Sequence, residues 1–136
     1  MKIDGVVETA IHVEDVARSA EFYQTLFGLR RLEGSERYCA LEVPGHAVFL
    51  LFKKGGTAAA IPTPGGMIPP HDGAGRMHFA FKIPRASLDS CARELEQRGI
   101  AIESRVEWLR GGTSLYFRDP DQHLVELITP GCWENY

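Results

Sequence analysis

The residues HLVELI, positions 123 to 128, form an apolar stretch that carries one carboxylate, Glu126. Their aliphatic character predicts a short β-strand. In an alternating antiparallel strand, Glu126 could simply point into water. Alternatively it faces a cleft, where a desolvated carboxylate requires a neighbouring cation or proton. The elements around this strand have to decide between the two interpretations.

The first half of the chain predicts a β-α-β-β-β succession. Residues 6–13, VVETAIHV, are rich in β-branched types and indicate a strand. Asp15 then offers an N-cap for a helix, and Gly28 supplies its C-terminal stop. The apolar stripe of this helix consists of Val16, Ala20, Tyr23 and Phe27. Three strands are predicted after it, at residues 29–33, 37–43 and 47–52.

A segment dense in glycine, proline and alanine follows at residues 53–75. It is too long for an ordinary turn, so we expect a linker, a gating loop, or both.

The second half predicts the same succession again. Residues 76–83, RMHFAFKI, indicate a strand, and a helix follows that ends at Gly99. The apolar stripe of this helix consists of Leu88, Cys91, Ala92 and Leu95. The remaining strands are predicted at residues 100–107, 113–117 and 123–128. The chain is therefore an internal duplication.

Aligning the halves brings polar residues to matching positions. With Gly99 placed on Gly28, His78 of the second opening strand falls on Glu8 of the first. In the closing strands, Glu126 falls on Leu50. Because side chains alternate along a strand, His78 lies on the face opposite Phe79 and the core. That face suits a cavity and an exposed surface nearly equally.

Composition limits the classes of function. The chain has 136 residues, 44% hydrophobic and 24% charged, which fits one ordinary globular domain. A net charge of −3 gives no basic surface for nucleic acid. We find no membrane-spanning run and no signal-peptide core, and the three cysteines are odd in number. A cytoplasmic protein without disulfides is expected.

The chain resembles the vicinal oxygen chelate superfamily, which includes glyoxalase I, extradiol dioxygenases and bleomycin-binding proteins. The matching segments are IHVEDVARSAEFYQTLFGL, GRMHFAF, SLYFRDPDQHLVEL and TPGCWENY. The resemblance implies an α+β fold in which two βαβββ modules place curved mixed sheets around a cleft. It implies a single domain, with module 1 at about 4–52, the linker at 53–75, module 2 at about 76–130 and a tail at 131–136.

The resemblance also implies a metal site. Carried over position by position, the ligands of a divalent ion would be Glu8, His78 and Glu126. The commonest first ligand of the family is histidine, whereas this chain has Glu8, and Leu50 stands where some members place a fourth ligand. One imidazole and two carboxylates suit Mn²⁺, Fe²⁺, Ni²⁺, Zn²⁺ or Mg²⁺.

Several other polar residues are weaker candidates. Tyr116 could act as an acid near bound substrate, or simply pack in the sheet. His12 lies four residues beyond Glu8, too far to share an ion, and could line the far end of the cleft. His71 could close over the cleft as part of a lid. His123 faces away from Glu126.

These residues support more than one function. The favoured hypothesis is a metal-dependent lyase or isomerase that acts on a small substrate with vicinal oxygens, with Glu8 and Tyr116 as catalytic groups. The alternatives are a metal-free binding protein of the bleomycin-resistance type and a ring-cleaving dioxygenase. The unpaired edges of the predicted sheets also favour a homodimer.

Overall fold

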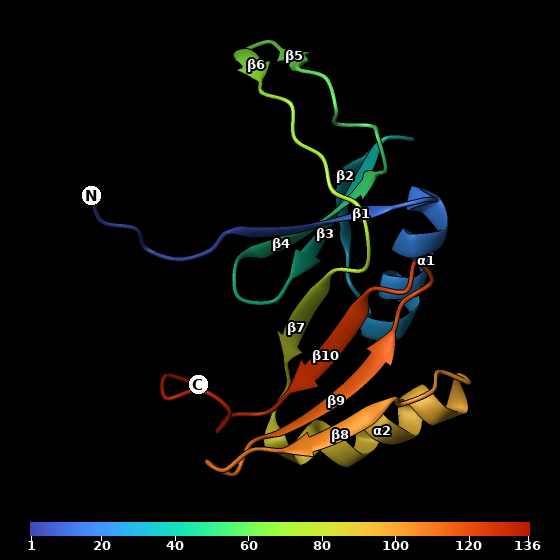
Figure 1. Ribbon diagram of the computed structural model, residues 1–136, viewed down its shortest axis with the longest axis vertical. Coiled ribbons are helices and arrows are strands. Elements are labelled where there is room, and N and C mark those ends of the chain that lie inside the picture. The colour runs from blue at the N-terminus through green and yellow to red at the C-terminus, as the bar shows by residue number, and fades with distance from the viewer. The chain divides into compact units, whose positions relative to one another are not determined.

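The computed structural model describes all 136 residues and divides them into two compact units, residues 1–75 and 76–136. Each unit contains a four-stranded sheet and one α-helix (Figure 1). Unit 1 consists of β1 (Glu8–Val13), α1 (Val16–Phe27), β2 (Arg31–Gly34), β3 (Tyr38–Val43), β4 (Ala47–Lys53), β5 (Ile61–Thr63) and β6 (Gly66–Ile68). Unit 2 consists of β7 (His78–Lys82), the 3₁₀ turn η1 (Arg85–Ser87), α2 (Leu88–Gln97), β8 (Ser104–Glu107), β9 (Thr113–Arg118) and β10 (Leu124–Ile128).

The two sheets share one topology. Their strand orders are β1-β4-β3-β2 and β7-β10-β9-β8. In each sheet the opening and closing strands pair in parallel, and the other pairs are antiparallel. These observations confirm the α+β class and the two βαβββ modules expected from the sequence.

The register of the parallel pairs confirms the alignment of the two halves. Glu8 pairs with Val48 in unit 1, and His78 pairs with Leu124 in unit 2. Two residues further along each closing strand lie Leu50 and Glu126. Glu8 and His78 therefore occupy equivalent positions. Glu8 lies diagonal to Leu50, and His78 lies diagonal to Glu126.

Helix ends form where the sequence predicts them. The Asp15 side chain accepts a hydrogen bond from the Arg18 amide at 3.0 Å and so caps α1. Gly28 and Gly99 follow the two helices with φ of 66° and 70°, a conformation that costs glycine little. The N-cap residue of α2, Ser87, makes no side-chain capping bond.

Alternation along the strands builds the core of each unit. In β7 the Phe79 side chain is buried whereas His78 and Ala80 are exposed, as the predicted face assignment requires. The largest fully buried side chains are Ile11, Tyr23, Leu41, Phe49 and Leu51 in unit 1, and Leu95, Leu115, Phe117, Leu127 and His123 in unit 2. Burial of these groups is the main favourable contribution to folding.

Strand β8 is shorter than predicted. The sequence suggests a strand over residues 100–107, but β8 starts at Ser104. The Ile100 amide is already bonded to the Leu95 carbonyl at the end of α2, at 2.9 Å. The chain joins the ladder only at Glu103, whose amide bonds the Tyr116 carbonyl.

The glycine- and proline-rich segment contains structure that the sequence did not predict. β5 and β6 pair as a short antiparallel hairpin between Ile61 and Ile68. Near the two ends of the segment, the His71 amide donates to the Thr57 carbonyl at 3.0 Å, and Thr57 is buried. The segment is therefore a closed loop fastened at its neck. Neither α-helix has the length and apolar content needed to cross a membrane.

Candidate functional site

A histidine and a glutamate meet on one face of the second sheet. The His78 Nε2 and Glu126 Oε2 atoms are 3.3 Å apart. The parallel register places these residues on neighbouring strands, diagonal to one another. Side chains so placed share a face and lie within reach of each other.

Glu126 is buried despite its charge. Its side chain is 6% exposed, whereas that of His78 is 50% exposed. A buried carboxylate is stable when hydrogen bonds or opposite charges replace its water. Glu126 has such a partner on each oxygen, because Oε1 accepts from the Tyr116 hydroxyl at 2.9 Å and Oε2 approaches His78. The solvated interpretation of Glu126 is thus excluded.

Tyr116 holds its proton firmly. It lies directly across the β9–β10 pair from Glu126. Burial, together with the hydrogen bond to the Glu126 carboxylate and its negative charge, raises the pKa of Tyr116 above 10.0, against a smaller opposing effect of a Ser114 hydrogen bond. At neutral pH, Tyr116 is therefore a hydrogen-bond donor and not a base.

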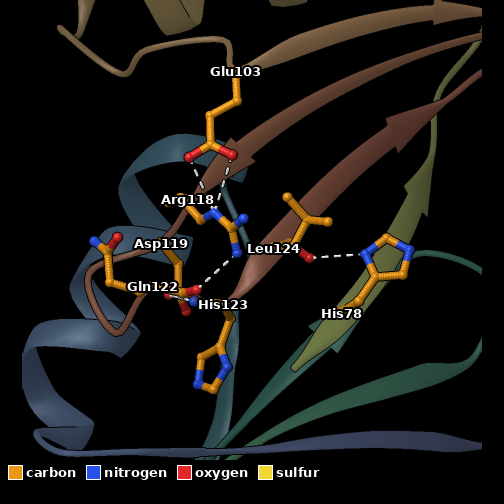
Figure 2. Close-up of polar contacts among 7 residues, drawn as sticks. All are labelled: His78, Glu103, Arg118, Asp119, Gln122, His123 and Leu124. Carbon is orange, nitrogen blue, oxygen red and sulfur yellow. Dashed lines mark hydrogen bonds and ion pairs between the residues drawn. The ribbon is translucent and has the colours of Figure 1, made fainter. Parts of the chain in front are cut away.

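The backbone fixes the orientation of the His78 ring. Its Nδ1 atom lies 3.1 Å from the Leu124 carbonyl oxygen (Figure 2). A carbonyl oxygen only accepts, so Nδ1 carries the hydrogen. In the neutral ring, Nε2 then directs a lone pair at the Glu126 carboxylate. Two facing lone pairs repel, so this pair requires either a proton on Nε2 or a cation between the groups. Histidines that bind a metal through one ring nitrogen usually donate the hydrogen of the other nitrogen to a carbonyl or carboxylate, as His78 does here.

Glu8 belongs to unit 1. It is exposed and lines a cavity of about 440 Å³ on that unit. Leu50 and Tyr38 of the sheet also line the cavity, as do Ile61, Ile68 and His71 of the loop between β4 and β7. The cavity volume is within the range of small-molecule pockets. Its lining combines apolar side chains with the charged residues Glu8, Glu33 and Arg37.

Aromatic rings form one side of this cavity. The Phe52 ring lies edge-on to His71 at 5.0 Å and tilted against Tyr38 at 6.3 Å, both measured between centroids. The Tyr38 hydroxyl donates to Glu33 Oε1 at 3.0 Å, and this hydrogen bond is the main reason that the pKa of Tyr38 is raised. His71 therefore contributes to the wall of the cavity.

His12 holds the neck of the loop. Its side chain is buried, with Nε2 at 3.2 Å from Thr57 Oγ1 and 3.8 Å from Asp72 Oδ1. A Cβ added at Gly73 would lie 2.6 Å from the ring, so the backbone there crosses His12 closely. His12 is thus a structural anchor under the loop, which the sequence analysis did not foresee.

The structure brings together part of the expected set of side chains. His78, Glu126 and Tyr116 meet in unit 2, whereas Glu8 lies in unit 1. Within either unit, no group of three or more histidine, cysteine, aspartate or glutamate side chains gathers to hold a metal ion. The three-residue ligand set thus stays a prediction.

Two buried polar residues of unit 2 received no functional role in the sequence analysis. His123 and Asp119 are 0% and 2% exposed, although they belong to the turn between β9 and β10. The signal that could have identified them is their spacing, because an aspartate that opens a tight turn often bonds the amides that follow it.

Comparisons with a family model and with solved structures identify the same superfamily. Residues 5–127 match the family model described as the Glyoxalase/Bleomycin resistance protein/Dioxygenase superfamily. The crystal structure of a lactoylglutathione lyase from Agrobacterium tumefaciens is 27% identical, has a TM-score of 0.88, and covers 98% of this chain and 99% of its own.

Two curated proteins are similar over part of their length. Catechol-2,3-dioxygenase of Bacillus subtilis (strain 168) is 27% identical over 116 residues, which are 85% of this chain and 38% of the relative. Biphenyl-2,3-diol 1,2-dioxygenase 3 of Rhodococcus globerulus is 43% identical over 67 residues, which are 47% of this chain and 35% of the relative. The chain thus spans little more than a third of either curated relative.

Proposed function

The chain belongs to the Glyoxalase/Bleomycin resistance protein/Dioxygenase superfamily, and from this membership we propose a metal-dependent enzyme that acts on a small substrate with vicinal oxygens. The favoured chemistry is that of a lyase or isomerase. The similarity to a lactoylglutathione lyase over nearly the full length of both chains supports this choice.

The observation that carries the proposal is the His78–Glu126 pair. A lone pair on Nε2 that faces a buried carboxylate at 3.3 Å is an arrangement that a divalent cation stabilises. Glu126, His78 and Glu8 would hold the ion, with Mn²⁺, Fe²⁺, Ni²⁺, Zn²⁺ or Mg²⁺ as candidates. The bound ion would supply Lewis-acid polarisation of a substrate oxygen.

The residues of the chain would divide the remaining work. Tyr116 occupies one oxygen of Glu126 and so leaves Oε2 free to bind. Tyr116 keeps its proton at neutral pH, so its proposed role is hydrogen-bond donation to a developing oxyanion, which requires the hydroxyl to turn from Glu126 toward the substrate. Glu8 is exposed in the cavity of unit 1 and is suited to act as a base. Both catalytic roles are part of the proposal.

The cavity of unit 1 suggests the shape of the substrate. The aromatic and aliphatic wall that includes Phe52, Leu50 and Ile68 would accept the apolar part of a small molecule, next to Glu8. We therefore propose a substrate with a compact apolar or aromatic group beside its two oxygens.

A ring-cleaving dioxygenase is the second candidate. Identity of 43% to a biphenyl-2,3-diol dioxygenase over 67 residues favours it. The replacement of the expected first histidine by Glu8 disfavours it, because oxygen-activating iron is usually held by two histidines and one carboxylate. The third candidate is a metal-free binding protein. The His78–Glu126 pair disfavours it, because a protein without a metal does not require two potential ligands at this position.

Metal content separates these candidates. We expect protein purified without added metal to contain a divalent ion by elemental analysis, and the variant Glu126→Gln to have lost most of it. Glu107→Gln, which alters an exposed carboxylate on β8 of the same unit, is the matched control. A metal-free wild type that also fails to bind Mn²⁺, Ni²⁺ or Zn²⁺ in titration would favour the binding protein.

Substrate screening follows from metal loading. Reconstituted protein would be tested against 2-oxoaldehyde–thiol adducts, hydroxyketones and catechols. Turnover of the adducts or hydroxyketones supports the lyase or isomerase, and oxygen consumption with catechols supports the dioxygenase.

We also propose a homodimer. Strands β1 and β2 are the edges of the first sheet, and β7 and β8 are the edges of the second. Edges of this kind are pairing sites unless they are covered. Sedimentation at micromolar concentration is expected to give twice the mass of the 15.1 kDa chain, and a monomer mass would refute this assembly.

A further inference from the structure

We propose that His123 and Asp119 are positioning residues that fix the tautomer and direction of the His78 ring. The inference rests on the proposed function only for its consequence on metal affinity. Its structural part concerns hydrogen bonds within unit 2, around the turn between β9 and β10 (Figure 2).

The first step is a side chain that substitutes for backbone. Met77 precedes β7, and its amide donates to Nδ1 of His123 at 2.9 Å. Its carbonyl accepts from the Leu124 amide at 2.8 Å. His123 thus takes the place of a strand carbonyl and extends the β7–β10 ladder by one bond, at the residue before His78.

The second step fixes His123 itself. Asp119 Oδ1 accepts from the amides of His123 at 2.8 Å and Asp121 at 2.9 Å, and the Asp119 amide bonds the His123 carbonyl at 3.2 Å. Asp119 and His123 are both buried. A buried carboxylate that accepts two amide bonds holds a turn in one conformation.

An outer contact supports the same turn. Arg118 donates through Nε to both carboxylate oxygens of Glu103, at 3.1 and 3.2 Å, and through a terminal nitrogen to the Gln122 carbonyl at 3.1 Å (Figure 2). Gln122 has φ of 67°, a left-handed conformation that disfavours side chains other than glycine. The polar network therefore stabilises a turn that its own sequence strains.

The third step reaches His78. Leu124 follows His123 directly, and its carbonyl oxygen holds Nδ1 of His78 at 3.1 Å. The position of this carbonyl depends on the turn, and the position of the His78 backbone depends on the bond from Met77. His123 therefore contributes to both restraints on the His78 ring, in addition to the pairing of Leu124 with His78 and Arg118.

The two histidines must carry opposite tautomers. The Met77 amide can only donate, so His123 Nδ1 is unprotonated and the neutral ring has its hydrogen on Nε2. His78 has its hydrogen on Nδ1, because a carbonyl faces that atom. Nitrogen-15 NMR of the imidazoles distinguishes these two forms, which gives the inference a direct signature.

The experiment compares two polar substitutions. His123→Asn keeps a side-chain acceptor at the place of Nδ1, whereas His123→Gln moves the acceptor one bond further out. On metal-free protein, at a pH high enough to keep the imidazole rings neutral, we expect His78 to hold its hydrogen on Nδ1 in the wild type and in H123N. In H123Q we expect a shift to a mixture of both tautomers. Leu95→Ala, which creates a cavity in the core of the same unit, serves as the control for destabilisation alone.

Metal binding supplies the second readout. We expect the affinity for Mn²⁺ to fall about tenfold in H123Q, because the Leu124 carbonyl that holds His78 would be displaced and loss of such an outer partner costs about 10- to 100-fold. In H123N we expect the affinity to be retained. If H123Q does not fold, Asp119→Ala is the alternative variant, because it removes the hydrogen bond that holds the His123 amide. The same shift in the His78 tautomer and the same loss of Mn²⁺ affinity are expected.

An unchanged His78 tautomer in H123Q would overturn the inference, as would an equal change in L95A. If the wild type binds no divalent metal, the proposed function fails, and the tautomer comparison still decides the inference.

Discussion

The two units of the chain have one topology but different chemistry. In unit 2 the diagonal between the opening and closing strands joins His78 to Glu126, with Tyr116 hydrogen-bonded behind them. In unit 1 the equivalent diagonal joins Glu8 to Leu50, which cannot coordinate or exchange a proton. The register is the same in both units. The fold therefore supplies equivalent positions in the two units, and the side chains at these positions determine whether two groups able to bind a cation meet there.

The surroundings of these positions differ as well. Unit 2 buries its carboxylate and surrounds it with hydrogen-bond partners, which favours a fixed charged centre. Unit 1 leaves Glu8 exposed beside a cavity with an aromatic wall, closed on one side by a loop that His12 anchors. These surroundings support the proposal that unit 2 supplies two of the metal ligands and that unit 1 supplies Glu8 and the wall that accepts the body of a small molecule.

The largest expected effects test whether the repeats pack equivalently. Leu51 and Leu127 hold matching positions in β4 and β10, and both are almost completely buried. Replacing either by alanine is expected to lower the free energy of unfolding by about 2 to 5 kcal/mol, from lost burial and the cavity left behind. Urea denaturation followed by circular dichroism measures both. A cost below this range for only one of the two leucines would show that the cores are not equivalent.

The next set of variants removes the ligands that distinguish the His78–Glu126 diagonal from the Glu8–Leu50 diagonal. Glu126→Gln and His78→Ala are each expected to fold and to bind divalent metal at least tenfold more weakly, about 1.4 kcal/mol. Glu126→Leu, which copies Leu50 into unit 2, should abolish the stabilisation of the folded state by metal. Calorimetric titration measures the affinities. Unchanged affinity in Glu126→Gln would remove this residue from the site.

Two tyrosine–glutamate pairs allow a smaller test. Tyr116→Phe leaves the buried Glu126 without one donor and should cost about 1 kcal/mol, whereas Tyr38→Phe breaks an exposed bond to Glu33 and should cost less. Thermal or urea unfolding at neutral pH gives both values. Equal costs would mean that burial of the Glu126 pair adds nothing.

The same pairs predict a dependence on pH. Since the folded protein raises the pKa of Tyr116 above 10.0, the folded state binds more protons than the unfolded state above that pH. The contribution is complete below pH 10 and is lost as pH rises through the raised pKa. Tyr116→Phe should therefore lose stability less steeply than the wild type above pH 10, which alkaline unfolding measures. An identical slope would contradict the assignment.

The smallest effect separates the two helices. Asp15→Ala removes a capping bond and should cost about 1 kcal/mol, whereas Ser87→Ala removes no side-chain cap and should cost close to nothing. Urea denaturation of both variants checks the difference. A larger cost for Ser87→Ala would show that the serine stabilises α2 by another route.

Much of the fold could be predicted from local patterns. Alternation placed Phe79 in the core and His78 on the opposite face, and Asp15 and Gly28 bounded α1, because these signals act within a few residues. The duplication then predicted that Glu8 matches His78 and that Leu50 matches Glu126, which the register confirms. The hairpin β5–β6 was missed because its glycine- and proline-rich strands carry weak propensity and form through their own pairing.

The tertiary structure alone decided the state of the candidate site. From the sequence, Glu126 could face either water or a partner, and the answer came from its burial and from its contacts with Tyr116 and His78. His12 and His123 were equally ambiguous, since the same side chain can serve as an exposed group, an anchor or a hydrogen-bond acceptor. Their roles follow from Thr57 and Met77, residues about 45 positions away in the chain, because long-range packing determines which polar groups meet.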